Sequence, residues 1–251
     1  MLREEIVFGP IRSRRLGSSL GINLLPERGK LCNFDCVYCE CGWNADGHGD
    51  KSIPDEAALR VALEGKLQKC AESGVIIDSI TFSGDGEPTL NPEFPSIIDT
   101  TLELRDSYYP EAKVSVLTNA TRLEAPGVFE ALRKVDNPVL KLDAPVTELA
   151  QVINRPQGTY QVKDVVSSIE RFNGDFVLQT MFLRMPGFDW DAPGILDAWM
   201  DIVRHLHPRQ VMAYTIDRPT PMPGLAKISP QEIEAMLRPL IDEGFKVDIY
   251  G

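Results

Sequence analysis

Residues 32–39, Cys-Asn-Phe-Asp-Cys-Val-Tyr-Cys, decide how the chain is interpreted, because they place three cysteines within eight residues. Thiolate sulfur is the soft ligand that selects zinc, copper(I) or iron–sulfur clusters. A disulfide framework is not expected, because the chain has five cysteines, an odd number. Disulfides would also be reduced in the cytosol. The thiols of Cys32, Cys36 and Cys39 are therefore candidate metal ligands.

Three cysteines are one ligand short of a closed metal site. A structural zinc site has four protein ligands, and so does an ordinary four-iron cluster. A cluster held by three thiolates leaves one iron for a substrate or cofactor. The alternative is a zinc site completed by Cys41 or His48. The cysteines alone leave both interpretations open.

The composition favours one globular domain with a sizeable core. The chain has 251 residues, of which 43% are hydrophobic and 25% charged. Within one domain over 1–251 we expect an N-terminal extension (1–19), a core (20–216) and a C-terminal loop, helix and short strand (217–251).

The charge and the apolar runs limit the partners. Lys and Arg number 26 against 37 Asp and Glu, which gives a formal net charge of −11. Nucleic-acid binding draws on neutralised phosphates, so this balance argues against a large RNA surface. No apolar run reaches the length of a membrane span, and the first residues lack the apolar core of a signal peptide. We expect a cytoplasmic protein with no membrane partner.

Apolar β-rich runs alternate with amphipathic helical segments along the chain, a pattern that indicates βα units and a parallel sheet. The expected strands are 20–25, 76–82, 113–117, 139–144, 176–183 and 210–216, with a short final strand within 245–250. The expected helices are 54–73, 92–106, 126–134, 162–172, 195–206 and one that starts at the capping residue Ser229. Helical spacing predicts that Cys70 and Trp199 are core residues.

The segment 83–89, Ser-Gly-Asp-Gly-Glu-Pro-Thr, follows the second expected strand. In parallel sheets, ligands bind at the carboxyl ends of the strands. Gly84 and Gly86 would let the backbone approach a ligand closely, and the carboxylate of Glu87 follows at once. Taken alone, this segment is equally well an ordinary turn between a strand and a helix.

Other polar residues follow later strands. Thr118 and Asn119 end the third strand, where they suit either a ligand or a turn. Lys141 and Asp143 alternate with leucines in the fourth. They either face the interior of a barrel as functional groups or form an ion pair at its rim.

The cysteine spacing, with Tyr38 just before the last cysteine, resembles the radical S-adenosylmethionine (SAM) superfamily. The segments 8–17, 39–42 and 83–90 are similar to those of short iron–sulfur oxidoreductases related to the wyosine-synthesis tRNA enzyme. The resemblance implies a partial (β/α)6 barrel of radical SAM type, α/β with parallel strands and outer helices. It also implies a [4Fe–4S] cluster on Cys32, Cys36 and Cys39, with SAM on the remaining iron.

The resemblance further implies a reaction and residue roles. Reductive cleavage of SAM gives a 5′-deoxyadenosyl radical that abstracts hydrogen from a substrate. The cofactor-binding residues implied are Tyr38 near the adenine, Gly84, Gly86 and Glu87 at the SAM amino group, and Thr118 and Asn119 at the sugar. The remaining candidates for the chemistry are Cys41, Lys141, Asp143 and Arg218, the last at the substrate or the SAM carboxylate.

An external one-electron reductant of the flavodoxin or ferredoxin type is implied as well. The wyosine enzymes carry further upstream cysteines, whereas this chain has none before Cys32. We therefore expect a small molecule or a peptide as substrate rather than a nucleic acid. The alternatives are a tRNA-modifying enzyme of the wyosine type, an activating enzyme for a glycyl-radical partner, and a zinc-stabilised binding protein.

Overall fold

The computed structural model divides into two compact units, which are described separately. The residues that the structure describes are 5–13, 15–26, 29–46 and 52–251. The first unit takes its residues from 1–32, 44–118 and 124–138, and the second from 33–43, 119–123 and 139–251. The predicted zinc ligand His48 lies outside the described residues.

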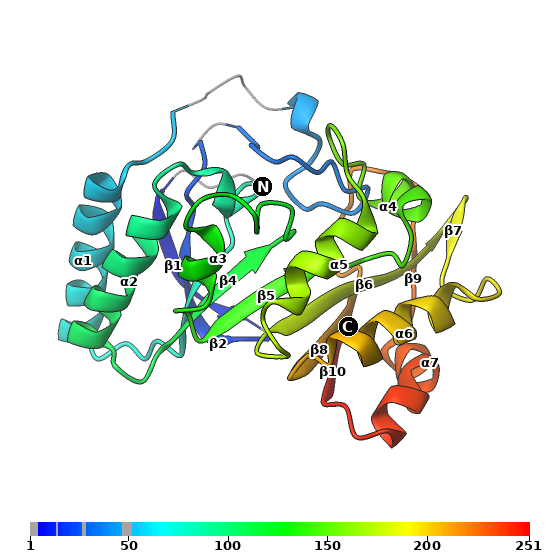
Figure 1. The fold of residues 1–251 in the computed structure, drawn as a ribbon. Coiled ribbons are helices and arrows are strands. Elements are labelled where there is room, and N and C mark those ends of the chain that lie inside the picture. Colours follow the sequence, from blue (N-terminus) through cyan, green and yellow to red (C-terminus); the bar gives the residue numbers. More distant parts are fainter. Residues whose placement is uncertain (1–4, 14, 27–28, 47–51) are drawn as a thin grey trace. The chain divides into compact units, whose positions relative to one another are not determined.

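The first unit is a mainly parallel sheet with helices against it (Figure 1). Its elements are β1 (Val7–Ser13), β2 (Gly17–Ile22), a short 3-10 helix (Asn44–Asp46), α1 (Glu56–Glu72), β3 (Ser79–Phe82), a second 3-10 helix (Pro88–Leu90), α2 (Phe94–Tyr108), β4 (Lys113–Thr118) and α3 (Val128–Leu132). Strands β2, β3 and β4 run parallel, so that Ile22 pairs with Phe82 and Phe82 with Val116. Their carboxyl ends therefore lie along one edge, and the segment 83–89 starts there.

Helix α1 shows how the sequence directs this unit. The Asp55 side chain accepts a hydrogen bond from the Ala58 N–H and caps the helix. Leu59, Leu63 and Leu67 recur at helical spacing and are fully buried. Cys70 continues this stripe at 6% exposure, so the prediction of a core role for it is confirmed. Helices α1 and α2 pack side by side (Figure 1).

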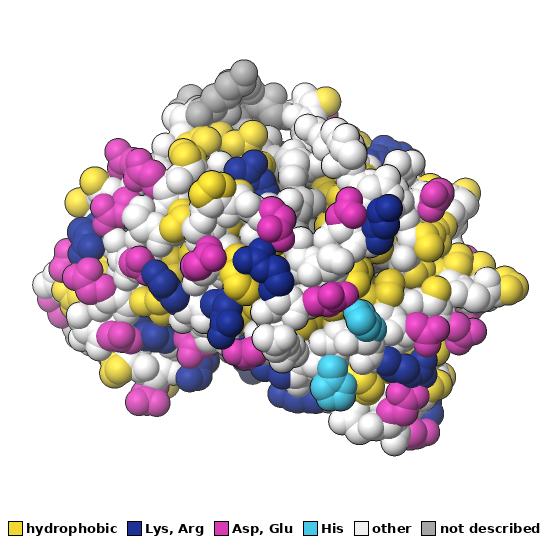
Figure 2. Space-filling view, in the orientation of Figure 1, with side chains coloured by type: hydrophobic (Ala, Val, Ile, Leu, Met, Phe, Trp, Pro, Cys, Tyr) yellow, Lys and Arg dark blue, Asp and Glu magenta, His cyan; other side chains and the backbone are white. Residues whose placement is uncertain are grey.

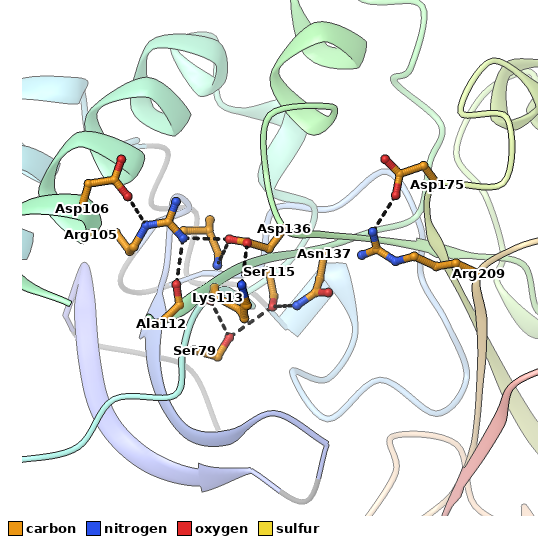
Figure 3. A network of polar contacts seen from close by, with 11 residues as sticks. Ser79, Arg105, Asp106, Ala112, Lys113, Ser115, Asp136, Asn137, Asp175 and Arg209 are labelled. Carbon is orange, nitrogen blue, oxygen red and sulfur yellow. Dashed lines mark hydrogen bonds and ion pairs between the residues drawn. The ribbon is translucent and has the colours of Figure 1, made fainter. Parts of the chain in front are cut away.

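A polar network ties α2 to the sheet in the first unit (Figure 3). The Arg105 guanidinium donates to Asp136 Oδ2 at 2.8 Å and to the Ala112 carbonyl at 2.8 Å. Asp136 also accepts from the Val114 N–H at 2.9 Å and from Lys113 Nζ at 3.3 Å. A carboxylate with this many donors is held firmly in its ionised form.

The second unit repeats the alternation of strands and helices. Its elements are β5 (Asn137–Lys141, whose first two residues belong to the first unit), α4 (Thr147–Ile153), α5 (Val162–Glu170), β6 (Val177–Met185), β7 (Phe188–Asp189), α6 (Ile195–Leu206), β8 (Gln210–Thr215), β9 (Ala226–Lys227), α7 (Pro230–Asp242) and β10 (Val247–Tyr250). Strands β5, β6, β8 and β10 are successive parallel neighbours. The final strand predicted within 245–250 is thereby confirmed.

An aromatic cluster fixes the core of the second unit. Phe182 stacks on Trp190 with ring centroids 4.8 Å apart, and Trp199 meets both rings edge-on. Both indoles are fully buried, so each needs a hydrogen-bond acceptor. Trp190 donates to the Met181 carbonyl and Trp199 to the Leu142 carbonyl. The predicted core role of Trp199 is confirmed, and its bond holds the backbone next to Asp143.

Besides the two short 3-10 helices, four of the described elements have no counterpart in the sequence analysis. Strand β1 pairs antiparallel with β2 although its sequence contains the turn formers Gly9 and Pro10. Helix α4 has seven residues, too few for a clear apolar period. Strands β7 and β9 have two residues each and form by antiparallel pairing with β6. Such short pairings depend on tertiary contacts rather than on local sequence.

The distribution of surface charge and the apolarity of the helices are relevant to which partners the protein could bind. On the face shown in Figure 2, acidic and basic side chains are interspersed over α1, α2 and α3. In the part of the chain that the structure describes, no helix has the length and apolarity needed to cross a bilayer.

We expect Asp136→Asn to lower the free energy of unfolding at neutral pH by roughly 1–3 kcal/mol, because hydrogen bonds to a charged group are lost. Burial alone would raise the pKa of Asp136, but the bonds from Val114, Arg105 and Lys113 hold it below its ordinary value. Because the pKa of Asp136 is lower in the folded than in the unfolded state, its ionised form stabilises the folded protein at pH values above the unfolded pKa of about 3.9. This contribution to the free energy of unfolding is lost as the pH falls through the folded pKa. Urea titrations at pH values from 7 down to 3 would measure the difference in the free energy of unfolding between variant and wild type.

The matched control for this experiment is Asp99→Asn. Asp99 pairs with Lys134 on the exposed surface, so its loss should change stability by less than about 0.5 kcal/mol. The difference in the free energy of unfolding between Asp136→Asn and the wild type should decrease below about pH 4. A gap that stays constant or widens in acid would contradict the assignment.

We expect Ser229→Ala to destabilise the protein by about 1 kcal/mol, equivalent to a fall in melting temperature of about 2–4 °C. Ser229 and Glu232 form the predicted capping box at the start of α7, each side chain bonding the other's backbone N–H. Thermal unfolding followed by circular dichroism measures the change. Ser168→Ala, on the exposed face of α5, serves as the control and should leave the melting temperature nearly unchanged.

Candidate cofactor site

In the first unit, the residue before Cys32 pairs with the glycine turn after β3. The Leu31 N–H donates to the Asp85 carbonyl at 3.0 Å, and the Glu87 N–H donates to the Leu31 carbonyl at 3.1 Å. Leu31 and Gly86 thus form a parallel bridge. The first of the three cysteines is therefore held at the carboxyl edge of the sheet by main-chain bonds.

Contacts with the protein's own main chain require a glycine at position 86 in this bridge. Its φ is +144°, and a Cβ built there would lie 1.8 Å from the Leu31 carbonyl oxygen. A Cβ at Gly84 would lie 2.0 Å from Asn23 Oδ1. Close approach to a ligand was the sequence-based reason for both glycines. The structure adds a second reason, namely that the protein's own backbone and the Asn23 amide occupy the space.

Glu87 lies in a buried cluster with two hydroxyl groups. Its side chain is 2% exposed. Its Oε1 accepts from the Thr89 N–H at 3.1 Å, from Thr89 Oγ1 at 2.6 Å and from Thr118 Oγ1 at 2.6 Å. Two predicted site residues, Glu87 in the turn after β3 and Thr118 at the end of β4, are therefore in direct contact. Hydrogen bonds of this kind stabilise the carboxylate form.

In the second unit, residues 33–43, here called the cysteine loop, are fastened to the end of α4. The Asp35 N–H donates to the Asn154 carbonyl at 2.9 Å, and the Val37 N–H donates to the Ile153 carbonyl at 3.0 Å. These two bonds flank Cys36. The last carbonyls of a helix lack partners within it, so α4 offers ready acceptors to the loop.

Asp143 is the centre of a buried polar network in the second unit. Its side chain is fully buried. Oδ2 accepts from the Tyr38 hydroxyl and from Asn154 Nδ2 at 2.7 Å, while Oδ1 accepts from the Met181 N–H at 2.9 Å. Lys141 Nζ lies 3.8 Å from Oδ2. Because its oxygens are occupied by the protein, the arrangement favours a positioning role for Asp143 over contact with a substrate.

Lys141 bridges two tyrosines in this network. Its Nζ donates to Tyr38 Oη at 3.1 Å and to Tyr214 Oη at 2.8 Å, and it lies 5.3 Å from each ring centroid. Burial alone would lower the pKa of Lys141, but the Asp143 carboxylate, Tyr214 and Cys36 together outweigh burial and raise that pKa. Of the two interpretations left open, the structure favours the matched pair over an exposed ion pair at the rim, because Asp143 is fully buried and the Lys141 side chain is only 18% exposed.

Cys36 is buried and faces an amide donor. Asn154 Nδ2 lies 3.4 Å from Cys36 Sγ. Burial raises the pKa of the Cys36 thiol to about 11, since the charged form loses its hydration. Burial and the Asp143 charge likewise raise the pKa of Tyr38 well above its ordinary value. A metal that binds Cys36 must therefore displace a proton from it.

Asn119 holds the cysteine loop through Asn33. Its Nδ2 donates to Asn33 Oδ1 at 2.7 Å, and its Oδ1 accepts from the Thr121 N–H and hydroxyl. Asn33 Nδ2 in turn donates to Thr121 Oγ1 at 2.6 Å. Asn119 therefore supports the segment next to Cys32, and its predicted contact with the SAM sugar stays a prediction.

Two further candidates lie at the end of the cysteine loop. The Arg218 guanidinium pairs with Glu40 at 2.5 Å, and the two side chains are 60% and 50% exposed. Arg218 therefore forms an ion pair with a carboxylate of the cysteine loop. Such an exposed ion pair contributes little to stability. Cys41 is half-buried. Beyond it, the Arg155 guanidinium lies over the Trp43 ring at 4.9 Å.

The sequence analysis missed Asn154 and Tyr214 as members of the site. Asn154 ends α4, a helix that was not predicted, so nothing marked it beyond its place before a proline at 156. Tyr214 follows Met212 at a spacing of two in β8, which places both on one face of the strand. That alternation was the available signal for Tyr214.

The cysteines suit a metal centre in their chemistry. No disulfide joins any of the five, and thiol sulfur is the donor that iron–sulfur clusters use. Among the side chains that the structure describes, no three potential ligands converge into a formed metal site. The ligand set of Cys32, Cys36 and Cys39 therefore stays a prediction from their spacing.

Comparison with known proteins identifies the family. The model of the Radical SAM superfamily matches residues 27–197, so the chain belongs to this superfamily. A UPF0026 protein from Synechocystis is 32% identical over 222 residues, which cover 86% of this chain and 77% of the relative.

Solved structures agree on the fold. A radical SAM methyltransferase from Sphaerobacter thermophilus aligns with 92% of this chain and 66% of its own at 16% identity, with a TM-score of 0.68. Streptococcus suis SuiB bound to SAM aligns with 92% of this chain and 50% of its own at 15% identity, with a TM-score of 0.63. The chain thus spans about two thirds and one half of these proteins. The predicted partial barrel of radical SAM type is confirmed.

Members of this superfamily bind a [4Fe–4S] cluster and SAM, which confirms the predicted cofactors. The residues present fit them in kind. Reduced thiols supply the soft donors, and Cys36 faces an amide hydrogen-bond donor. The bridge between Leu31 and Gly86 places Cys32 beside the turn that carries Glu87.

We expect Gly86→Ala to destabilise the protein by at least about 2 kcal/mol, because the new methyl group would collide with the Leu31 carbonyl at an unfavourable φ. Gly65→Ala is the matched control. Gly65 lies in α1 with nothing within 4 Å of a built Cβ, so alanine there should stabilise by about 0.5–1 kcal/mol. Urea unfolding measures both, and equal effects at the two positions would contradict the bridge.

Proposed function

We propose that Cys32, Cys36 and Cys39 hold a [4Fe–4S] cluster and that the chain uses it to cleave SAM and abstract hydrogen from a substrate. The observation that carries the proposal is the cysteine spacing within a chain of the Radical SAM superfamily. The bond pattern that ties Leu31 to Gly86 supports it, because it joins the first cysteine to the glycine turn.

The roles of the glycine turn follow from its chemistry. Glu87 is our candidate partner for the SAM ammonium group, with Thr89 and Thr118 holding its carboxylate. A buried carboxylate next to a cation contributes most when its orientation is fixed beforehand. The main chain at Gly84 and Gly86 would line the same position.

The roles in the second unit follow from its network. When bound, the cluster and SAM supply a 5′-deoxyadenosyl radical, while the protein provides orientation and exclusion of water. Tyr38 is our candidate contact for the adenine, and its hydroxyl is fixed by Asp143 and Lys141. Cys41 and Arg218 are candidates for contact with the substrate.

We propose a small molecule or a peptide as substrate and an external one-electron reductant of the flavodoxin or ferredoxin type. The net charge of −11 supports this choice over a nucleic acid. Among the structural neighbours, SuiB was solved with its precursor peptide SuiA, which shows that this fold accepts peptides in that protein.

The test compares the triple variant Cys32→Ala, Cys36→Ala, Cys39→Ala with the wild type. After anaerobic reconstitution, the wild type should carry about four irons and four sulfides per chain, as a [4Fe–4S] cluster requires. With a strong reductant and SAM it should form 5′-deoxyadenosine. The triple variant should lose the iron, the brown colour and the product, since its remaining thiols are too few.

Cys70→Ala is the control, because Cys70 belongs to the core of α1. Its iron content should equal that of the wild type. Product formation by the triple variant would refute the proposal, and so would a wild type that binds one zinc and no iron. A radical signal on a co-purified protein would instead indicate an activating enzyme.

A further inference from the structure

The Asn154 side chain donates a hydrogen bond to a cysteine sulfur in the cysteine loop. It ends α4 and is 2% exposed. Its backbone carbonyl accepts from Asp35 in the loop, while its side chain reaches Asp143, Tyr38 and Cys36. One residue therefore holds both the backbone and a thiol of the loop.

The orientation of the Asn154 amide is dictated by Asp143. An ionised carboxylate only accepts hydrogen bonds, and Asp143 Oδ2 lies 2.7 Å from the amide. The amide must therefore present its NH2 group to Asp143 rather than its oxygen. The same nitrogen lies 3.4 Å from Cys36 Sγ, so the sulfur receives a donor.

The NH2 group has two hydrogens and its partners differ in strength. The Asp143 carboxylate, at the shorter distance, takes one. The second is directed at Cys36 Sγ and Tyr38 Oη, both at 3.4 Å. Once iron binds Cys36, the thiolate is the stronger acceptor of these two, because it carries negative charge.

We propose that Asn154 is a positioning residue that donates an N–H···S hydrogen bond to Cys36 and thereby raises the reduction potential of the cluster. This proposal rests on the proposed function, since it requires Cys36 to be a ligand. Hydrogen bonds to cluster sulfurs set the potential because they stabilise the more negative, reduced state. Asp143 takes part by fixing which atom of Asn154 faces the sulfur.

Asn154→Ser tests the contribution of the hydrogen bond that the second amide hydrogen makes to Cys36. A serine hydroxyl has one hydrogen, and Asp143 as a charged acceptor would take it, so no donor is left for Cys36. We expect the reduced-to-oxidised ratio of the cluster at a fixed potential to fall up to about tenfold. That fall equals a negative shift of ~59 mV for one electron. Potentiometric titration of the reconstituted protein without SAM, followed by electron paramagnetic resonance, measures it.

Asn137→Ser is the matched control. The Asn137 amide donates to Ser115 in the first unit. Its midpoint potential should equal that of the wild type. Asn154→Ala is the second variant, and it should shift the potential in the same direction as Asn154→Ser.

The outcomes separate the two proposals. A wild type that binds no iron–sulfur cluster overturns the proposed function. A wild type that binds the cluster, with Asn154→Ser unchanged or shifted to a more positive potential, overturns only the role of Asn154. The role is also overturned if both Asn154 variants fold by circular dichroism but bind no iron, because the residue would then be required for assembly rather than for tuning.

Discussion

The second unit depends on the burial of one carboxylate. An ionised carboxylate in the interior is tolerated only when donors or cations compensate for its lost hydration. Asp143 receives donors from the cysteine loop, from the end of α4 and from β6, and a cation from β5. Removal of one partner would weaken this compensation. This requirement brings the cysteine loop and β6, which are distant in sequence from Asp143, together with the nearby β5 and the end of α4.

The first unit meets a different constraint, which is steric. Leu31 can donate to and accept from the glycine turn only because Gly86 has no side chain. The main chain thereby sets where Cys32 leaves the sheet. In this unit a backbone contact positions the start of the three-cysteine motif, whereas in the second unit the charged network includes Tyr38 of the motif itself.

The sequence predicted the periodic part of the fold well. The helices with regular apolar stripes and the parallel strands were found, because burial repeats along them at 3.6 or two residues. Helix α4 and the strand β1 were missed, since the first is short and the second is stabilised by pairing with β2. The residues named for the site were found from motifs and strand ends. Asn154 was missed because its role depends on a helix end that no local pattern announced.

The interpretation of individual site residues changed for the same reason. Lys141 and Asp143 were predicted from charge within a strand, but only the structure shows that tyrosines and an asparagine surround them. Asn119 was predicted at a cofactor from its position at a strand tip, and the structure adds that its amide donates to Asn33. Sequence position predicts where a polar group lies, and its partners come from segments far along the chain.

The three tryptophans lie in two different environments, so their fluorescence emission can be separated. Trp190 and Trp199 are fully buried among aromatic rings, while Trp43 is half-buried in the cysteine loop beside Arg155. The long-wavelength part of the emission therefore reports mainly on the loop, and the short-wavelength part reports on the interior. Changes in the loop become visible by fluorescence without any attached dye.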